Sequence, residues 1–227
     1  MDSRPARTLA RPSRSSRMTL MALALVALAT SGSRAEDAAD WRPLFDGQGL
    51  GQWKPTPFGG EGEVTADDGV LRIAMGADLS GVTWKGEFPR QNFELAVEAR
   101  RVEGSDFFCG LTFPVADSHC SLILGGWGGG VVGLSCIDGE DAANNATTKV
   151  MSFTEGRWYA VRVKVTPDRI TCFLDDEQIV DQPLADCRIS VREEVVPSQP
   201  LGIATYATTA ELRNIRWRPA AAPAGEP

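Results

Sequence analysis

Segments in which apolar and polar residues alternate recur along this chain, and this period of two is its most restrictive feature. The alternation runs through residues 93–100 and again through residues 159–165. Because successive side chains of a β-strand point to opposite faces, such a period is typical of strands with one buried face. Almost no helical periodicity is found between residues 53 and 201. The chain therefore predicts an all-β fold.

Turn-forming residues separate the predicted strands. Asp67-Asp68-Gly69 divides two short strand-like segments, and Asp-Gly predicts a hairpin because it accommodates positive φ. Residues 166–169 and Asp175-Asp176 divide a later stretch into a three-stranded meander. In the last strand Leu212 is out of phase with the residues that follow, which predicts a β-bulge near Arg213-Asn214. Many short strands with glycine and proline between them indicate a sandwich or a barrel.

The first 35 residues are typical of a secretory signal peptide. Five arginines precede a ten-residue apolar run, residues 20–29, and Ser33-Arg34-Ala35 approximates a cleavage site. This run is too short to span a bilayer, which argues against a membrane anchor. The pattern predicts a secreted or periplasmic protein, although a disordered basic leader or a start at Met18 fits the same residues. We expect one domain at residues 36–219 and a disordered tail at residues 220–227.

The net charge of the chain excludes some classes of partner. The leader contains six of the 23 basic residues and one of the 30 acidic residues, so 17 basic and 29 acidic residues remain, a net charge of about −12. Such a surface repels the phosphates of nucleic acids and anionic lipid headgroups. We therefore expect no nucleic-acid partner and no insertion into a membrane.

The five cysteines do not form a metal-binding pattern, because none has the C-x-x-C spacing of a zinc site. Export would permit disulfides, but an odd number leaves at least one thiol unpaired. We expect the cysteines to be small buried residues on strands, and a Cys120–Cys136 disulfide across a hairpin is the alternative. The cysteines are Cys109, Cys120, Cys136, Cys172 and Cys187.

Four short motifs occur in order between residues 41 and 219. Phe45-Asp46-Gly47, followed by Leu50 and Gly51-Gln52-Trp53, opens this stretch, and Leu212-Arg213-Asn214-Ile215-Arg216 closes it. Asn92-Phe93-Glu94-Leu95 and Gly156-Arg157-Trp158-Tyr159 lie between them. Together they resemble the LFDGKSLDGW, EFRNIRI, DFEL and GEWN motifs of the 3-keto-disaccharide hydrolase domain family.

This resemblance implies a concanavalin A-like jelly-roll β-sandwich of two antiparallel sheets with a carbohydrate-facing concave side. It also implies action on glycosides that carry a ketone at C3. A base removes the C2 proton, the C1 substituent leaves by β-elimination, and hydration of the enone completes net hydrolysis. Such chemistry needs a base near the proton and a cation or hydrogen-bond donor near the enolate. Carbohydrate is the implied partner.

The sequence departs from the family in one strand, for which the family motif is NSGVFFR. Residues 104–113 occupy this place without reproducing the family's Asn and Arg, and the whole chain contains one histidine. A mechanism that needs several histidines is therefore excluded. A non-catalytic carbohydrate-binding or envelope-associated β-sandwich is the alternative to a hydrolase or lyase.

Trp127 is the strongest candidate for binding a sugar ring. It lies among five glycines in residues 125–130, between two apolar runs. A hairpin whose tip needs unusual backbone angles explains the glycines, and a glycine loop that lets a ligand approach Trp127 explains them equally well. The other tryptophans lie in or beside strand patterns and are predicted to be core residues. These are Trp41, Trp53, Trp84, Trp158 and Trp217.

His119 and Asp106 are the candidate catalytic bases, and Tyr206 is a second candidate for binding substrate. His119 is the one side chain that titrates near neutrality without perturbation. Asp106 lies on the segment that replaces the family's polar strand. Tyr206 lies in a polar and aromatic segment before the last strand. A surface histidine and ordinary packing residues are the alternatives.

An oxygen-rich loop is the candidate metal site. Asp138, Glu140 and Asp141 lie close to Asn144 and Asn145, and Ca²⁺ prefers carboxylate and amide ligands. The spacing does not match an EF-hand, so a solvated acidic loop is the alternative.

Overall fold

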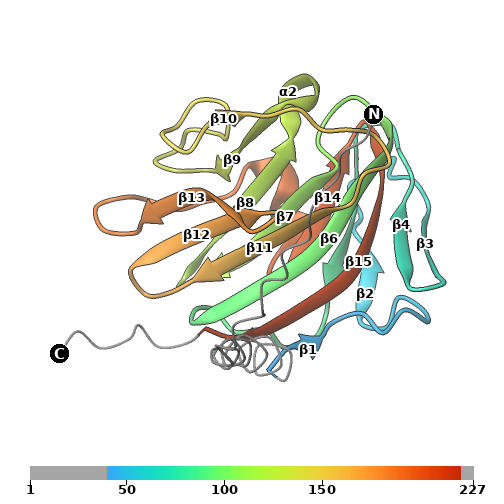
Figure 1. Ribbon diagram of the computed structural model, residues 1–227, viewed down its shortest axis with the longest axis horizontal. Helices are drawn as coiled ribbons and strands as arrows, with labels where there is room; N and C mark the ends of the chain where they lie inside the picture. Colours follow the sequence, from blue (N-terminus) through green and yellow to red (C-terminus); the bar gives the residue numbers. More distant parts are fainter. Residues whose placement is uncertain (1–39, 221–227) are drawn as a thin grey trace, which may run out of the picture. The chain divides into compact units, whose positions relative to one another are not determined.

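The computed structural model describes residues 40–220, which form a β-sandwich of two sheets (Figure 1). Every strand pairing in this part of the chain is antiparallel. The all-β fold of two antiparallel sheets is therefore confirmed. Within residues 40–220, no helix is long and apolar enough to cross a membrane. The predicted leader and residues 221–227 of the predicted tail lie outside the described residues.

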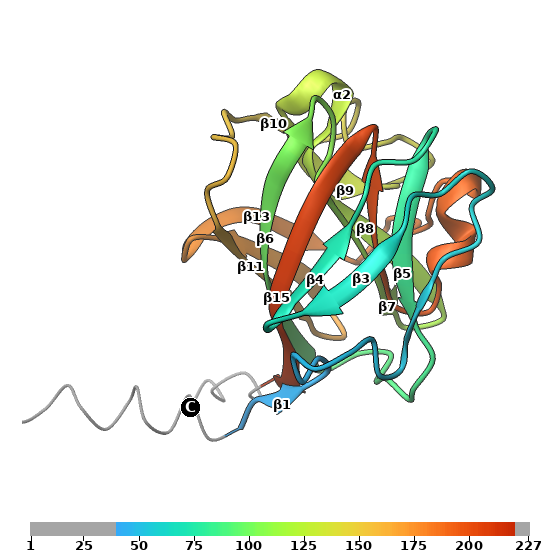
Figure 2. The same ribbon diagram turned by 90° about the vertical axis from the view of Figure 1, so that its right-hand side faces the viewer.

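The larger sheet has eight strands and the smaller sheet has seven. Figure 2 shows them packed face to face, with the 3₁₀ helix η1 (Glu193–Ser198) outside the smaller sheet. The larger sheet runs in the order β13 (Glu177–Pro183), β12 (Arg169–Leu174), β11 (Tyr159–Val165), β6 (Phe93–Gly104), β15 (Thr208–Pro219), β4 (Val70–Ile73) and β3 (Val64–Asp67), and β1 (Arg42–Pro43) pairs with β15. The smaller sheet runs in the order β10 (Lys149–Val150), β9 (Val131–Ser135), β8 (Ser118–Gly125), β7 (Cys109–Val115), β14 (Gly202–Tyr206), β5 (Leu79–Trp84) and β2 (Trp53–Pro55).

The turns and the bulge occur where the sequence predicts them. Asp68 and Gly69 join β3 to β4 with φ of 47° and 80°, which are the positive angles that a tight hairpin of this kind requires. β11, β12 and β13 form the predicted meander. The register of β15 shifts between Arg213 and Arg216, and Asn214 has a φ of 53°. The β-bulge near Arg213-Asn214 is therefore confirmed.

Apolar side chains from the facing surfaces of both sheets fill one core. Phe93 and Leu95 on β6 and Leu111 and Phe113 on β7 are fully buried within it. Burial of each such side chain stabilises the fold by roughly 1.5–3 kcal/mol. Trp53 also belongs to this core, and its Nε1 donates a hydrogen bond to the carbonyl oxygen of Leu44 (2.9 Å). The alternation read from the sequence thus identifies which side chains are buried.

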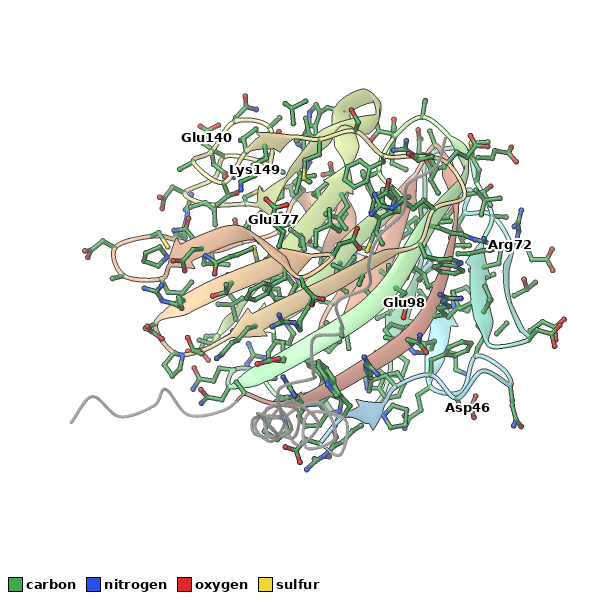
Figure 3. The ribbon with its side chains drawn as sticks, viewed as in Figure 1. Asp46, Arg72, Glu98, Glu140, Lys149 and Glu177 are labelled. Atoms are coloured by element: carbon green, nitrogen blue, oxygen red, sulfur yellow. The ribbon has the colours of Figure 1, made fainter. Side chains whose placement is uncertain are left out.

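Two predicted core tryptophans lie instead on the outer face of the larger sheet. The half-buried Trp158 ring has the Arg100 and Arg213 guanidiniums at 4.6 and 4.2 Å from its centroid. Trp41 is placed in the same way between Arg216 and Arg218. Arg213 also pairs with Glu98 of β6, labelled in Figure 3. The prediction of a core position was wrong for Trp158 and Trp41, because cation–π contacts cover the rings instead.

The five cysteines are free thiols, so the alternative of a Cys120–Cys136 bridge is not observed. Cys109, Cys120, Cys136 and Cys172 are buried, and Cys187 is partly exposed. Burial raises the pKa of Cys109 and of Cys120 to about 12. Since the thiolate is the reactive form, buried thiols of this kind react slowly.

We expect thiol titration to separate Cys187 from the four buried cysteines. In the folded protein near neutral pH, a thiol reagent should modify at most one cysteine, and Cys187→Ser should abolish that reaction. In denaturant all five should react. Modification of two or more thiols in the folded protein would contradict the burial described above.

Candidate functional site

Three connections that carry the chain from one sheet to the other lie side by side. They join β4 to β5, β6 to β7 and β14 to β15. The backbone N–H of Tyr206 donates to the carbonyl of Phe107 (3.1 Å), and that of Ala207 donates to the carbonyl of Asp78 (3.1 Å). Side chains that are far apart in the sequence, including those of Asp78, Asp106 and Tyr206, are gathered by these crossings.

A pocket with a volume of about 490 Å³ opens beside these connections, on the outer face of the smaller sheet. Part of its wall comes from Ser121 on β8 and its partner Ser135 on β9. The next pair, Leu122 and Leu134, faces the core, so the two serines face outward. The volume is typical of sites that bind small ligands, which span roughly 300–1,000 Å³. The lining residues are Asp78, Leu79, Asp106, Phe107, Ser121, Ile123, Trp127, Ser135, Arg192, Glu194, Val195 and Tyr206.

Trp127 lines the pocket from the short helical segment α2 (Gly126–Gly129), which joins β8 to β9. The backbone of Trp127 is left-handed, with φ 49° and ψ 55°, and its side chain is 45% exposed. Gly125 and Gly128 beside it have φ of 79° and 84°. The expected unusual backbone angles are confirmed. A left-handed non-glycine residue is disfavoured by roughly 1–2 kcal/mol, so other contacts must hold the loop in this form.

The Asp106 carboxylate accepts two backbone hydrogen bonds, and one of them holds this loop. Its Oδ1 accepts a hydrogen bond from the Phe107 N–H (2.8 Å), and its Oδ2 accepts one from the Gly128 N–H (2.8 Å). The second bond links the β6–β7 connection to residues 125–130, the Trp127 loop. A carboxylate offers about four acceptor positions, so each oxygen can still accept a hydrogen bond from a ligand.

Tyr206 forms the opposite aromatic wall with Phe107. The two rings stack with centroids 6.1 Å apart and an interplanar angle of 29°. The charge of the Asp78 carboxylate, which also hydrogen-bonds to the phenol, raises the pKa of Tyr206. The phenol is therefore a neutral donor at physiological pH.

Arg192 provides a cation in the pocket wall. Its Nε donates to Glu194 Oε1 (2.5 Å) and its Nη1 donates to Asp141 Oδ2 (3.0 Å). The hydrogen bond to Glu194 raises the pKa of Arg192, so the guanidinium stays charged. A guanidinium has five N–H donors, and these two contacts use one each, so donors remain for a ligand.

The structure thus brings together three of the predicted site residues, Asp106, Trp127 and Tyr206. Sequence reasoning missed Asp78, Arg192 and Glu194, which no local motif marks. Exposed aromatic rings suit the apolar faces of a sugar ring, and carboxylates, hydroxyls and a guanidinium suit its hydroxyl groups. The pocket combines both kinds of group.

His119 does not line this pocket. It lies on the same face of β8 as Ser121 but two residues earlier, and it is half-buried. Burial, followed by the charge of Arg90, lowers the pKa of His119. Its buried Nε2 has no hydrogen-bond partner among the described residues. Of the two candidate bases, Asp106 lines the pocket and His119 does not.

The predicted calcium ligands have other partners. Asp138 Oδ1 accepts from the Arg188 N–H (2.7 Å), and Asp141 Oδ1 accepts from Asn144 Nδ2 (2.8 Å). Glu140 lies on the same loop, at the periphery of the molecule (Figure 3). In the part of the chain that the structure describes, no group of three or more His, Cys, Asp or Glu side chains is placed to hold a metal ion. The loop geometry gives the calcium hypothesis no support.

We expect His119 to make the protein less stable at mildly acidic pH. Its pKa is lower in the folded chain than in the unfolded chain, so protonation favours unfolding as pH falls below about 6.5. Because it is the one histidine of the chain, His119→Asn should reduce the loss of unfolding free energy between pH 7 and pH 5 in urea denaturation. An unchanged pH dependence in this variant would contradict the assignment.

Solved structures of low sequence identity share the fold. Crh5 transglycosylase in complex with NAG has a TM-score of 0.55 at 13% identity, covering 82% of this chain and 86% of that chain. A glycosyl hydrolase candidate from Parabacteroides distasonis ATCC 8503 has 0.53 at 13%, covering 82% and 97%. The carbohydrate-binding module CBM66 from Bacillus subtilis has 0.51 at 14%, covering 74% and 95%.

A search of curated protein sequences gave no match. A family model does match, over residues 40–218, and it describes the 3-keto-alpha-glucoside-1,2-lyase-like domain. The resemblance read from the four motifs is therefore confirmed. The match indicates a carbohydrate-active, glycosyl hydrolase-like domain, and the chain belongs to this 3-keto-disaccharide hydrolase family.

Proposed function

We propose that the pocket binds a glycoside and cleaves 3-keto-glycosides, with Asp106 as the base and Trp127 as the platform for the sugar ring. The observation that carries this proposal is the Asp106–Gly128 hydrogen bond, which places a carboxylate beside an exposed tryptophan in one pocket. The family match supports this choice of reaction class. The predicted leader would place this activity outside the cytoplasm, in the periplasm or the medium.

In the proposed reaction, Asp106 takes the proton from C2 and the electron pair moves towards the C3 ketone. Arg192 is the donor in the pocket wall that would stabilise the resulting enolate oxygen, since the one hydroxyl hydrogen of Tyr206 is donated to Asp78. Collapse of the enolate forms the C1–C2 double bond and breaks the bond from C1 to the leaving oxygen, which gains a proton. Addition of water across the double bond then gives net hydrolysis.

Binding without turnover is the second candidate function. Both Asp106 oxygens already accept backbone hydrogen bonds, which suits a structural role as well as a catalytic one. Residues 104–113 also lack the Asn and Arg of the family motif. The fold itself serves both a transglycosylase and a carbohydrate-binding module, so it does not choose between the two.

The first prediction on function concerns turnover by the full chain. Incubation with 3-keto-trehalose or a 3-keto-glucoside should release 3-keto-glucose, and Asp106→Asn should reduce kcat by roughly 10²–10⁴-fold, the usual effect of losing a general base. Trp127→Ala should instead weaken sugar binding by about 30-fold, or about 2 kcal/mol.

Trp158→Ala is the matched control, because Trp158 lies on the outer face of the larger sheet and not in the pocket lining. It should leave sugar affinity unchanged. Wild-type protein that binds sugar but releases no product would establish the second candidate, and retained turnover in Asp106→Asn would remove Asp106 as the base.

The second prediction concerns the charge of the sugar. Among the residues that the structure describes, Asp78, Asp106 and Glu194 line the pocket with one cation, Arg192, which Glu194 and Asp141 already engage. A uronic acid should therefore bind roughly tenfold or more weakly than its neutral counterpart at low ionic strength. Calorimetric titration of matched glucoside–glucuronide and galactoside–galacturonide pairs measures this difference.

Glu194→Gln should narrow the difference between the neutral and anionic sugars, since it removes one carboxylate from the pocket. Glu193→Gln is its control, because Glu193 is exposed on the same 3₁₀ helix but does not line the pocket. Equal affinity for both members of each pair would show that these carboxylates do not select the ligand.

A further inference from the structure

Arg101 is a buried cation close to the pocket but absent from its lining. It lies near the end of β6, and 8% of its surface is exposed. Its Nη2 approaches three backbone carbonyl oxygens, those of Asp106 (2.9 Å), Gly129 (3.3 Å) and Gly125 (3.4 Å). Gly125 and Gly129 stand on either side of Trp127 in the chain. One guanidinium therefore holds both flanks of the Trp127 loop.

The same group also supports the other attachment of the loop. Arg101 holds the backbone carbonyl of Asp106, while the Asp106 carboxylate accepts the Gly128 N–H. The backbone of the loop is adapted to this contact, because a Cβ at Gly125 would lie 2.7 Å from Arg101 Nη2. Three loop residues are thus attached, directly or through Asp106, to a single buried side chain.

Burying the charged side chain of an arginine carries a desolvation penalty. Burial lowers the pKa of Arg101, although the charge of Asp106 opposes this shift. Its Nε is buried without a hydrogen-bond partner among residues 40–220, which leaves part of the desolvation unfavourable. Its guanidinium also lies 5.4 Å from the centroid of the buried Phe108 ring. Such a residue contributes less to stability than an apolar side chain of the same size would.

We propose that Arg101 is a positioning residue, which fixes the left-handed Trp127 loop so that the indole faces the pocket. It acts through backbone carbonyls and does not touch the ligand. The loop is strained, and the charge-assisted hydrogen bonds from one rigid guanidinium hold it in a single conformation. Trp127 is thereby placed before the ligand arrives, which reduces the entropy lost on binding.

The effect on sugar affinity rests on the proposed function, whereas the effect on Trp127 itself does not. The experiment therefore uses two readouts. The first is the indole N–H signal of Trp127 in the NMR spectrum of the free, full-length protein, assigned by its loss in Trp127→Phe. The second is affinity for methyl glucoside and for a 3-keto-glucoside, measured by calorimetry.

Arg101→Gln and Arg101→Lys are compared with Arg100→Gln. Arg100 is the neighbouring residue on the same strand, and its side chain faces the other way and pairs with Glu211. Arg101→Gln should shift or broaden the Trp127 signal and weaken binding by roughly tenfold, since hydrogen bonds to charged groups are the strong ones. Arg101→Lys should keep part of the wild-type Trp127 signal and part of the sugar affinity. If Arg101→Gln does not fold, these two measurements on Arg101→Lys test the proposal. Arg100→Gln should change neither.

A double-mutant cycle with Trp127→Ala tests whether Arg101 acts through Trp127. In the Trp127→Ala background, Arg101→Gln should cause no further loss of affinity. An equal loss in both backgrounds would overturn the proposal, as would a variant that melts earlier while keeping the wild-type Trp127 signal and affinity. If wild-type protein binds no sugar, the proposed function fails, and the Trp127 signal alone then confirms or overturns the role of Arg101.

Discussion

The pairing of β6 with β15 is the constraint on which the rest of the molecule depends. Its register runs from Phe93 opposite Pro219 to Gly104 opposite Thr208, so it joins distant parts of the chain along the centre of the larger sheet. At its end the strands approach so closely that a Cβ on Gly104 would lie 2.4 Å from the carbonyl oxygen of Ala207. Beyond this point both strands connect to the smaller sheet, β6 through the β6–β7 connection and β15 through the β14–β15 connection. These two connections place Asp106 and Tyr206 side by side. The pocket is a consequence of this crossing.

The structural role of Asp106 is compatible with its proposed role as a base. The hydrogen bonds from the Phe107 and Gly128 N–H groups hold the carboxylate in one orientation, and the bond from Gly128 at the same time holds the Trp127 loop. A base is effective when its oxygen is fixed relative to the proton that it accepts. The contacts that stabilise the loop are therefore the contacts that would orient the base.

The strands, the Asp68-Gly69 hairpin and the bulge near Asn214 could be predicted from the sequence because their signals are local. A period of two and a need for positive φ are properties of adjacent residues, and the glycines around Trp127 belong to the same class. Asp78, Arg192 and Glu194 carry no such mark. They reach the pocket from the β4–β5 connection and from the segment that crosses the smaller sheet, so only the tertiary fold places them together. The position of His119 outside the pocket lining could not be predicted for the same reason, since its sequence neighbourhood does not reveal how far along β8 the pocket extends.

The two outer faces of the sandwich explain why the pocket lies on the smaller sheet. The larger sheet covers its outer face with long side chains, in which Arg100 and Arg72 both pair with Glu211. The smaller sheet carries small residues there instead. A Cβ at Gly202 would lie 2.5 Å from the carbonyl oxygen of Ser198, so the segment around η1 can lie directly on the sheet.

Thr83 Oγ1 completes this contact by donating to the carbonyl of Pro197 (3.0 Å). A sheet face covered by long ion-paired side chains leaves little room for a ligand, whereas a face of small residues under a separate segment leaves space wherever that segment ends. The pocket lies where Arg192, Glu194 and Val195 meet the Trp127 loop. The small outward residues are Gly81 and Thr83 of β5, Gly110 and Thr112 of β7, and Gly202 and Ala204 of β14. They are the sequence feature that leaves room for the pocket, and the aromatic and charged residues at its rim would determine what it binds.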